Sequence, residues 1–434
     1  MSADLAGAGV VDHHLAWPYI LQGTGVPVVQ RGDEEFTVGA GDGFTVGPGV
    51  PHEMWAGDDG ALFRWRTSPA LRTGEMNCAL WECARDNGWK PTGLQLFDVI
   101  SGYGDAEKLT LNFLIVPWPP EVRPVQFESV KPLSSETRNM PPGFSFFTYK
   151  QDNPADSGYS IRAIIEDLYA KATRKLGKID AVVLPEAALS FDEHTTLSRD
   201  ILEKKSFLIS GVASPSFHSP ESEKHGENRV YIDLPALHSL YQPKHHRWKL
   251  DQSQISQYGL GSRLYPEKLW WEHISLDYRH LYFAAVMPWL VMSVLICEDL
   301  ARPDPVGDLV RSVGPNLVIA LLMDGPQLKE RWGARYATTL ADDPGCSVLT
   351  VTSAGMCSLS RPSSGVGRSR VVALWKDAKS GAPVEIELPE GQDGVVISLS
   401  VRLLEEWTAD GRSDRRNAGY PILSGIHYVS RTSK

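Results

Sequence analysis

The stretch that decides the fold is 290-LVMSVLICEDLARPDPVGDLVRSVGPNLVIALLM-323, in which two apolar runs enclose a polar segment that begins at Cys297. The second run, 316–323, is apolar on both faces, which is typical of a strand in the covered sheet of a layered α/β domain. The first run, 290–296, ends in Cys-Glu-Asp, so a thiol and two carboxylates follow directly on a buried strand. Layered α/β folds commonly carry catalytic groups where strands leave the core. We therefore expect this turn to belong to a functional site.

Two further motifs place a charged side chain in a comparable position. Glu186 follows the apolar run 181–184 in Ala-Val-Val-Leu-Pro-Glu, and Lys244 stands in Tyr-Gln-Pro-Lys-His-His. In amide or nitrile hydrolysis a cysteine serves as nucleophile, a carboxylate shuttles its proton, and an ammonium stabilises the oxyanion. We expect Cys297, Glu186 and Lys244 to fill these roles. The two histidines that follow Lys244 face opposite sides of a strand, so they do not suggest a shared metal ion.

These motifs, in the chain order Glu, Lys, Cys, resemble the carbon–nitrogen hydrolase (nitrilase) superfamily over residues 108–405. The resemblance continues in 314–325, in 363–377 and in 332–337, where Arg335 stands in the helix whose arginine this family packs behind the site. It implies an α/β fold of four layers, α-β-β-α, and a hydrolase that forms a thioester on its cysteine. It also implies a small-molecule amide or nitrile substrate, no cofactor, and a homo-oligomer.

The family often carries a second glutamate between the lysine and the cysteine, and Glu272 resembles it in its distance from Cys297. Glu272 lies further beyond Lys244 than is usual, which an insertion would explain. The alternatives that stay open are Glu267 and Asp251 for this carboxylate, and Lys249 and Lys268 for the lysine.

Strands and helices alternate through the rest of 108–405. Helical spacing of apolar residues predicts helices over 161–176, which Gly177 would end, and over 327–341. The residues that follow, 406–434, are expected to form a C-terminal extension.

The N-terminal part has a different character. Residues 41–55, Gly-Asp-Gly-Phe-Thr-Val-Gly-Pro-Gly-Val-Pro-His-Glu-Met-Trp, resemble the second motif of cupins. A partial, all-β, cupin-like module is therefore expected over 1–105, and the resemblance implies that His52 faces its interior. The segment 15–30 lacks the His-x-His and the glutamate of metal cupins, so we expect no metal ion in this module.

Composition narrows the class of protein. The 434 residues are 42% apolar and 22% charged, which excludes a globally disordered chain. The net charge of −10 argues against a broad nucleic-acid or anionic-membrane surface. The longest charge-free stretch, 281–297, contains Pro288 and is short for a membrane helix. Five sparse cysteines and the lack of a signal-like N-terminus favour a reducing, cytoplasmic location.

A second class of function stays open. The Pro-rich segment 117–143 and the insertion at 245–270 depart from small free-standing amidases. Nitrilase-like domains also occur fused to other enzymes, including reverse transcriptases in bacterial phage defence. The alternative is therefore an accessory or regulatory module with a binding or scaffold role. In a third interpretation, the cupin-like module is a sensor and the hydrolase domain its output.

Overall fold

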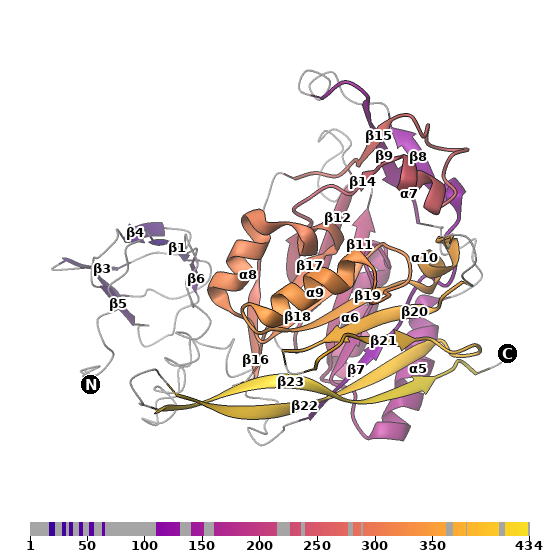
Figure 1. Ribbon diagram of the computed structural model, residues 1–434. Coiled ribbons are helices and arrows are strands. Elements are labelled where there is room, and N and C mark those ends of the chain that lie inside the picture. Colours follow the sequence, from indigo (N-terminus) through magenta and orange to yellow (C-terminus); the bar gives the residue numbers. More distant parts are fainter. Residues whose placement is uncertain are drawn as a thin grey trace. The chain divides into compact units, whose positions relative to one another are not determined.

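The structure, a computed structural model, is shown in Figure 1. It describes residues 17–21, 28–31, 34–37, 43–46, 52–55, 63–65, 110–130, 140–151, 160–214, 226–235, 239–276, 281–287, 290–361, 368–378, 380–407 and 413–432. The chain divides into two compact units, Met1–Gly104 and Asp105–Lys434.

The first unit contains two small antiparallel sheets, of order β4-β1-β6 and β3-β2-β5. Their strands are β1 (Trp17–Leu21), β2 (Val28–Arg31), β3 (Glu34–Thr37), β4 (Gly43–Val46), β5 (His52–Trp55) and β6 (Phe63–Trp65). The described part of this unit consists of strands, as the predicted β-rich module requires. His52 begins β5 and pairs with Arg31, but the orientation of its side chain lies outside what the structure describes.

The second unit contains a seven-stranded sheet of order β13-β12-β11-β10-β7-β22-β23. Its strands are β7 (Thr110–Ile115), β10 (Ala181–Val183), β11 (Phe207–Ser214), β12 (Glu227–Asp233), β13 (Leu240–Pro243), β22 (Gly394–Trp407) and β23 (Ser413–Val429). The strands β7, β10 and β11 run parallel at its centre, and the outer strands pair antiparallel. Residues 413–429 of the expected C-terminal extension thus form the edge strand β23 of this sheet.

A six-stranded sheet of order β16-β17-β18-β19-β20-β21 faces the first one. Its strands are β16 (Phe283–Met287), β17 (Leu290–Ile296), β18 (Leu317–Leu322), β19 (Ser347–Thr352), β20 (Val371–Lys376) and β21 (Val384–Glu387). The strands β17, β18 and β19 are parallel, and every residue of β18 is buried. The apolar run at 316–323 therefore forms the doubly covered strand that its sequence predicts.

Side-chain hydrogen bonds join the two sheets across their interface. The Gln242 amide on β13 donates to the carbonyl of Val294 on β17 at 2.8 Å. The Ser347 hydroxyl on β19 donates to the carbonyl of Pro421 on β23 at 2.6 Å. The first of these bonds places the ends of β13 and β17 next to each other, which matters for the site described below.

Helices cover the outer faces of both sheets, so the unit has four layers, α-β-β-α (Figure 1). The seven-stranded sheet is covered by α5 (Ile161–Leu176) and α6 (Phe191–Glu203). The six-stranded sheet carries α9 (Trp332–Asp342), on the side where Figure 1 also shows α8 (Asp308–Val313). The predicted fold class is confirmed. A short helix, α10 (Ala354–Leu359), follows β19.

The sequence predicts the first residue of one helix correctly and places the start of the other too early. The helix expected over 161–176 has these bounds, because the Ser160 side chain accepts from the N–H of Ala163 and Gly177 ends it at φ 82°. Its apolar stripe packs into the core, where each fully buried aliphatic side chain adds roughly 1.5–3 kcal/mol. The helix expected from 327 begins only at Trp332, because Arg331 is extended at its N-cap (φ −83°, ψ 166°).

A four-stranded sheet of order β14-β15-β9-β8, the third sheet of this unit, draws its strands from in and around the Pro-rich segment 117–143 and the insertion at 245–270. It consists of β8 (Phe127–Val130), β9 (Phe144–Tyr149), β14 (Lys249–Leu250) and β15 (Leu269–Glu272), with α7 (Gln252–Gln257) beside it. Aromatic side chains dominate its core: Phe127, Phe147, Trp248, Tyr258 and Trp270. This small sheet brings Glu272 to the main body of the unit.

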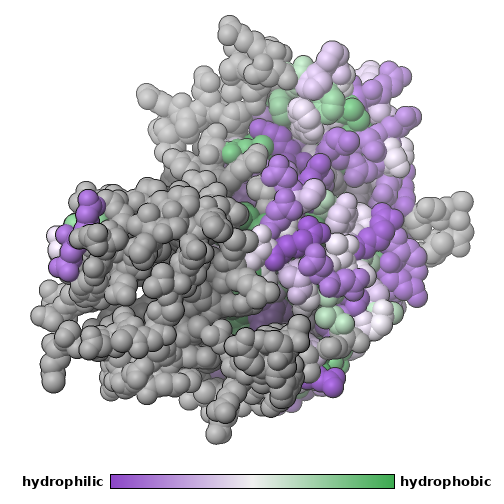
Figure 2. Space-filling view, turned by 60° about the vertical axis from the view of Figure 1, so that its left-hand side comes forward, coloured by the Kyte–Doolittle hydropathy of each residue, from purple (hydrophilic) through white to green (hydrophobic). Residues whose placement is uncertain are grey.

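The described surface in Figure 2 is mostly hydrophilic, with small separate apolar areas. Tyr265 is the most exposed large apolar side chain among the described residues, at 71%. No helix in the described ranges is long and apolar enough to cross a membrane.

Candidate active site

Glu186 is fixed by the close approach of its turn to β11. The N–H of Gly211 donates to the carbonyl of Pro185 at 3.2 Å, and the carbonyl of Gly211 accepts from Ala188 at 2.9 Å. A Cβ on Gly211 would lie 2.5 Å from the Cα of Glu186, so only glycine permits this contact. The Glu186 side chain is consequently held, buried, beyond the carboxyl end of β10.

Lys244 follows β13 directly and is completely buried. Its backbone N–H donates to the carbonyl of Asn228 on β12 at 2.9 Å, which continues the pairing of these two strands. The Nζ atom lies 2.7 Å from Oε1 of Glu186 and 2.6 Å from Oε2 of Glu272. Two of the three ammonium protons are therefore used by carboxylates, and the third is left for another acceptor.

Glu272 ends β15 and is fully engaged by donors. Its Oε2 accepts from Lys244 and from the backbone N–H of Trp248 at 3.1 Å, and its Oε1 accepts from the amide of Asn228 at 2.8 Å. The Glu272 N–H in turn donates to the carbonyl of Trp248. These contacts place Glu272 beside Lys244.

Cys297 begins a 3-10 turn, Cys297–Ala301, directly after β17. Its φ of 44° is unusual for a residue with a side chain, and such backbone strain clusters at functional sites. The thiol is 2% exposed. Burial, and next the negative charge of Glu186, raise the pKa of Cys297 well above its ordinary value, while Lys244 acts to lower it. The resting sulfur is thus a thiol within electrostatic range of both groups.

The carboxylate of Asp299 joins the lysine loop to this turn. It accepts from the backbone N–H of His245 at 3.1 Å and of His246 at 2.9 Å, and from Nδ1 of His246 at 2.9 Å. The Asp299 side chain is completely buried. Because His245 directly follows Lys244, Asp299 fixes the lysine relative to the cysteine.

Burial and the neighbouring charges shift the pKa values of Glu186 and Lys244. Burial raises the pKa of Glu186 above its usual range, although Lys244 opposes the shift. Burial acts to lower the pKa of Lys244, but the carboxylates of Glu186 and Glu272 outweigh it and raise that pKa well above its usual value. Oε1 of Glu186 accepts from both Lys244 and Asn228, whereas Oε2 has no hydrogen-bond partner among the described residues. Oε1 of Glu186 is therefore occupied by two hydrogen bonds, and Oε2 can accept a further proton or hydrogen bond.

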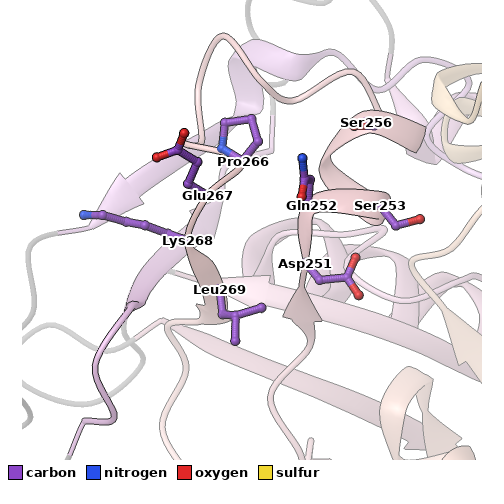
Figure 3. A pocket seen from close by; sticks show the side chains of 8 residues that line it. All are labelled: Asp251, Gln252, Ser253, Ser256, Pro266, Glu267, Lys268 and Leu269. Atoms are coloured by element: carbon purple, nitrogen blue, oxygen red, sulfur yellow. The ribbon is translucent and has the colours of Figure 1, made fainter.

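The structure thus brings together all four expected site residues, Glu186, Lys244, Glu272 and Cys297. The alternatives Asp251, Glu267 and Lys268 instead line an open pocket of about 540 Å³ between α7 and the start of β15 (Figure 3). None of the four converging side chains lines this pocket. Lys249 is exposed. Asp251 also has a local structural role, because its side chain accepts from the N–H of Gln254 as the N-cap of α7.

One expectation about the surroundings is wrong. Arg335 was expected to pack behind the site, but it is exposed. Arg331, the N-cap residue of α9, is the arginine of this region that is partly buried against a carboxylate, because its Nη2 lies 2.6 Å from Oδ1 of Asp324. Asp324 also accepts from the Tyr258 hydroxyl and from the Trp332 indole. Its charge is among those that raise the pKa of Cys297.

Asn228, whose amide donates to both Glu186 and Glu272, was not singled out by the sequence analysis. Only the pairing of β12 with β11 and β13 reveals its place. In the described part of the chain, no group of three or more His, Cys, Asp or Glu side chains is arranged to hold a metal ion.

Comparisons with known proteins address the two units separately. Residues 10–69 match the family of AraC-like ligand binding domains, which confirms the predicted cupin-like module. No curated protein matches the sequence.

Among solved structures, the chain is similar to a Saccharomyces cerevisiae member of the nitrilase superfamily (13% identity, TM-score 0.40), over 68% of this chain and 92% of that one. It is also similar to a mutant amidase of this superfamily from Nesterenkonia (11% identity, TM-score 0.39), over 67% and 90%. A third similar structure is the NitFhit protein of C. elegans (12% identity, TM-score 0.40), over 67% and 61%.

Proposed function

We propose that the protein hydrolyses a non-peptide C–N bond, of an amide or a nitrile, through a thioester on Cys297. The observation that carries this proposal is the meeting of Glu186, Lys244, Glu272 and Cys297, which come from four separate segments of the chain. A buried ammonium between two buried carboxylates is expensive to assemble for stability alone. Its position beside a strained cysteine supports a chemical role.

In the acylation step Cys297 is the nucleophile, Glu186 accepts its proton, and Lys244 stabilises the developing charge. Oε2 of Glu186 accepts the thiol proton while Sγ of Cys297 attacks the carbon of the substrate. The third proton of Lys244 stabilises the charge that develops on the substrate oxygen or nitrogen. For an amide, Glu186 then returns the proton to the leaving nitrogen, the C–N bond breaks, and ammonia or an amine departs. For a nitrile, the thioimidate takes up water before ammonia leaves. Either route yields a thioester.

Deacylation uses the same groups in reverse order. Glu186 accepts a proton from water, and the hydroxide attacks the thioester carbon. The C–S bond breaks, the thiol regains its proton, and a carboxylic acid leaves. In this scheme Glu272 does not exchange protons, because both of its oxygens already accept from fixed donors. It positions Lys244.

Ammonia release from a pooled library of small amides and nitriles tests this proposal. The wild type is expected to release ammonia, and Cys297→Ala and Glu186→Gln are expected to lose at least a hundredfold of that rate. Cys357→Ala is the matched control, because Cys357 is equally buried and burial raises its pKa to about 12. Equal ammonia release by wild type and Cys297→Ala would contradict the proposal.

We propose in addition that the N-terminal unit binds a small molecule and regulates the hydrolase unit, as a sensor. The match of residues 10–69 to a ligand-binding family favours this role. Comparing ammonia release by the full chain and by Asp105–Lys434 would test it, with altered turnover expected. Unchanged turnover would contradict the regulatory role.

A further inference from the structure

Asn228 donates to both carboxylates of the site from a single amide group. Its Nδ2 lies 2.7 Å from Oε1 of Glu186 and 2.8 Å from Oε1 of Glu272. A primary amide carries two N–H donors, so both are used. The side chain is 5% exposed, and it stands on β12, whose backbone also binds that of Lys244. The orientation of the amide is unambiguous, because the opposite one would point its oxygen at two carboxylates.

These contacts distinguish the two oxygens of Glu186. Oε1 accepts from both Asn228 and Lys244, whereas Oε2 has no hydrogen-bond partner among the described residues. Hydrogen bonds to a carboxylate oxygen occupy its lone pairs and stabilise its charged form. An incoming proton therefore binds at Oε2. Without the amide, Oε1 would keep an open lone pair and compete for that proton.

We propose that Asn228 is a positioning residue that makes Oε2 of Glu186 the proton acceptor and keeps this carboxylate ionised near neutral pH. The inference rests on the proposed function, in which Glu186 accepts the proton of Cys297. The S–H bond breaks, an O–H bond forms at Oε2, and the electron pair stays on sulfur. Asn228 does not touch the reacting atoms.

The electrostatics of the cluster agree with this role. Burial raises the pKa of Glu186, and the hydrogen bonds from Lys244 and Asn228 both oppose that shift. Removing the amide is therefore expected to raise the pKa of Glu186 further. More of the protein would then hold a protonated Glu186 at neutral pH, unable to accept the thiol proton.

The rate at which iodoacetamide alkylates Cys297, measured in the full-length protein from pH 5.5 to pH 9 by peptide mass, tests the proposal. In this reaction the S–C bond forms and iodide leaves, so the rate depends on thiolate formation but not on turnover. In Asn228→Leu the rate should fall roughly tenfold at pH 6 and recover toward the wild-type rate at high pH, since a hydrogen bond to a charged group is worth about a factor of ten.

Two further variants make the outcome decisive. Asn228→Asp keeps the size of the side chain but puts a third carboxylate beside two others, so its loss at pH 6 should exceed that of Asn228→Leu. Asn112→Leu is the control, because this half-buried amide donates to the carbonyl of Lys178 at the opposite end of the central strands, and its pH profile should match the wild type.

A pH profile of Asn228→Leu or Asn228→Asp that coincides with the wild type would overturn the proposal, even where the variant is less stable. The alkylation assay separates this failure from that of the proposed function. A wild type that cleaves no amide or nitrile, but whose alkylation profile shifts in the Asn228 variants, would retain the role of Asn228 and reject the hydrolase. The reverse result would retain the hydrolase and reject the role of Asn228.

Discussion

The Nζ atom of Lys244 lies 2.7 Å from Oε1 of Glu186, although 58 positions separate the two residues in the sequence. One residue follows an antiparallel edge strand and the other follows a parallel central strand of the same sheet. Glu272 lies on the other side of the ammonium. The positive charge of Lys244 therefore compensates the negative charges of two buried carboxylates.

Lys244→Met should lower the free energy of unfolding by about 3–5 kcal/mol, because it leaves two buried carboxylates without their cation. Urea denaturation measures this value. Lys249→Met, at an exposed position two residues before Asp251, the N-cap of α7, should change stability by less than about 0.5 kcal/mol. Equal urea midpoints for the two variants would show that Lys244 is not an integral part of the cluster.

Asp299→Asn should release the lysine loop from the cysteine turn. The carboxylate accepts from two backbone N–H groups and one imidazole, whereas an asparagine amide would direct its own N–H groups at some of these donors. We expect a loss of about 1–3 kcal/mol in stability. Ammonia release should fall roughly tenfold or more, since small displacements of reacting groups are costly. Asp308→Asn, at a 71% exposed side chain, is the control and should leave both quantities unchanged.

Arg331 and Arg335 provide a matched pair on either side of the start of α9. Arg331→Ala removes the cation beside the buried Asp324 and should destabilise the protein by about 2 kcal/mol, less than a fully buried pair because Arg331 is partly exposed. Arg335→Ala, at an exposed position, should stay within about 0.5 kcal/mol of the wild type. Thermal or urea denaturation of both variants decides between the two arginines, and a larger effect at 335 would contradict this assignment.

His194 predicts a pH dependence of stability. Burial between Ser210 and Asp233 lowers the pKa of His194 to about 4. In the unfolded chain a histidine takes up its proton near pH 6.5, so the unfolded state binds more protons than the folded state between pH 6.5 and pH 4, and stability falls as pH falls. From pH 7.5 to pH 5 the wild type should lose about 2 kcal/mol more than His194→Leu.

Asp233, whose Oδ2 lies 3.7 Å from Nε2 of His194, acts in the opposite direction. Burial raises its pKa to about 6, so its contribution to stability is lost as pH rises through that value. Because the two side chains are in contact, the comparison is repeated with Asp233→Asn in both proteins, which isolates His194. Parallel pH profiles for the wild type and His194→Leu would contradict the prediction.

The sequence was sufficient to predict the residues that lie at the ends of regular elements. Glu186 and Cys297 follow apolar runs, and the apolar composition of these runs is enough to predict that they are buried. The helix at 161–176 begins after Ser160 and ends at Gly177, two residue types that are typical of helix termini. These features are local, so the pattern of neighbouring residues determines them.

What the sequence did not reveal depends on contacts between distant segments. The small sheet around Trp248 is assembled from strands of two to six residues in two separate parts of the chain, too short to show a period. The place of Asn228 follows from strand register, and the ion pair of Arg331 with Asp324 joins the start of α9 to the residue that follows β18 and Met323.

The most direct test of the account is the intact mass of the full-length protein after incubation with pooled small amides and nitriles, followed by rapid acid quenching. The account predicts an added mass equal to an acyl group on the wild type and on Cys346→Ala, and none on Cys297→Ala. An identical adduct on Cys297→Ala, or ammonia release that Cys297→Ala retains in full, would contradict the thioester route.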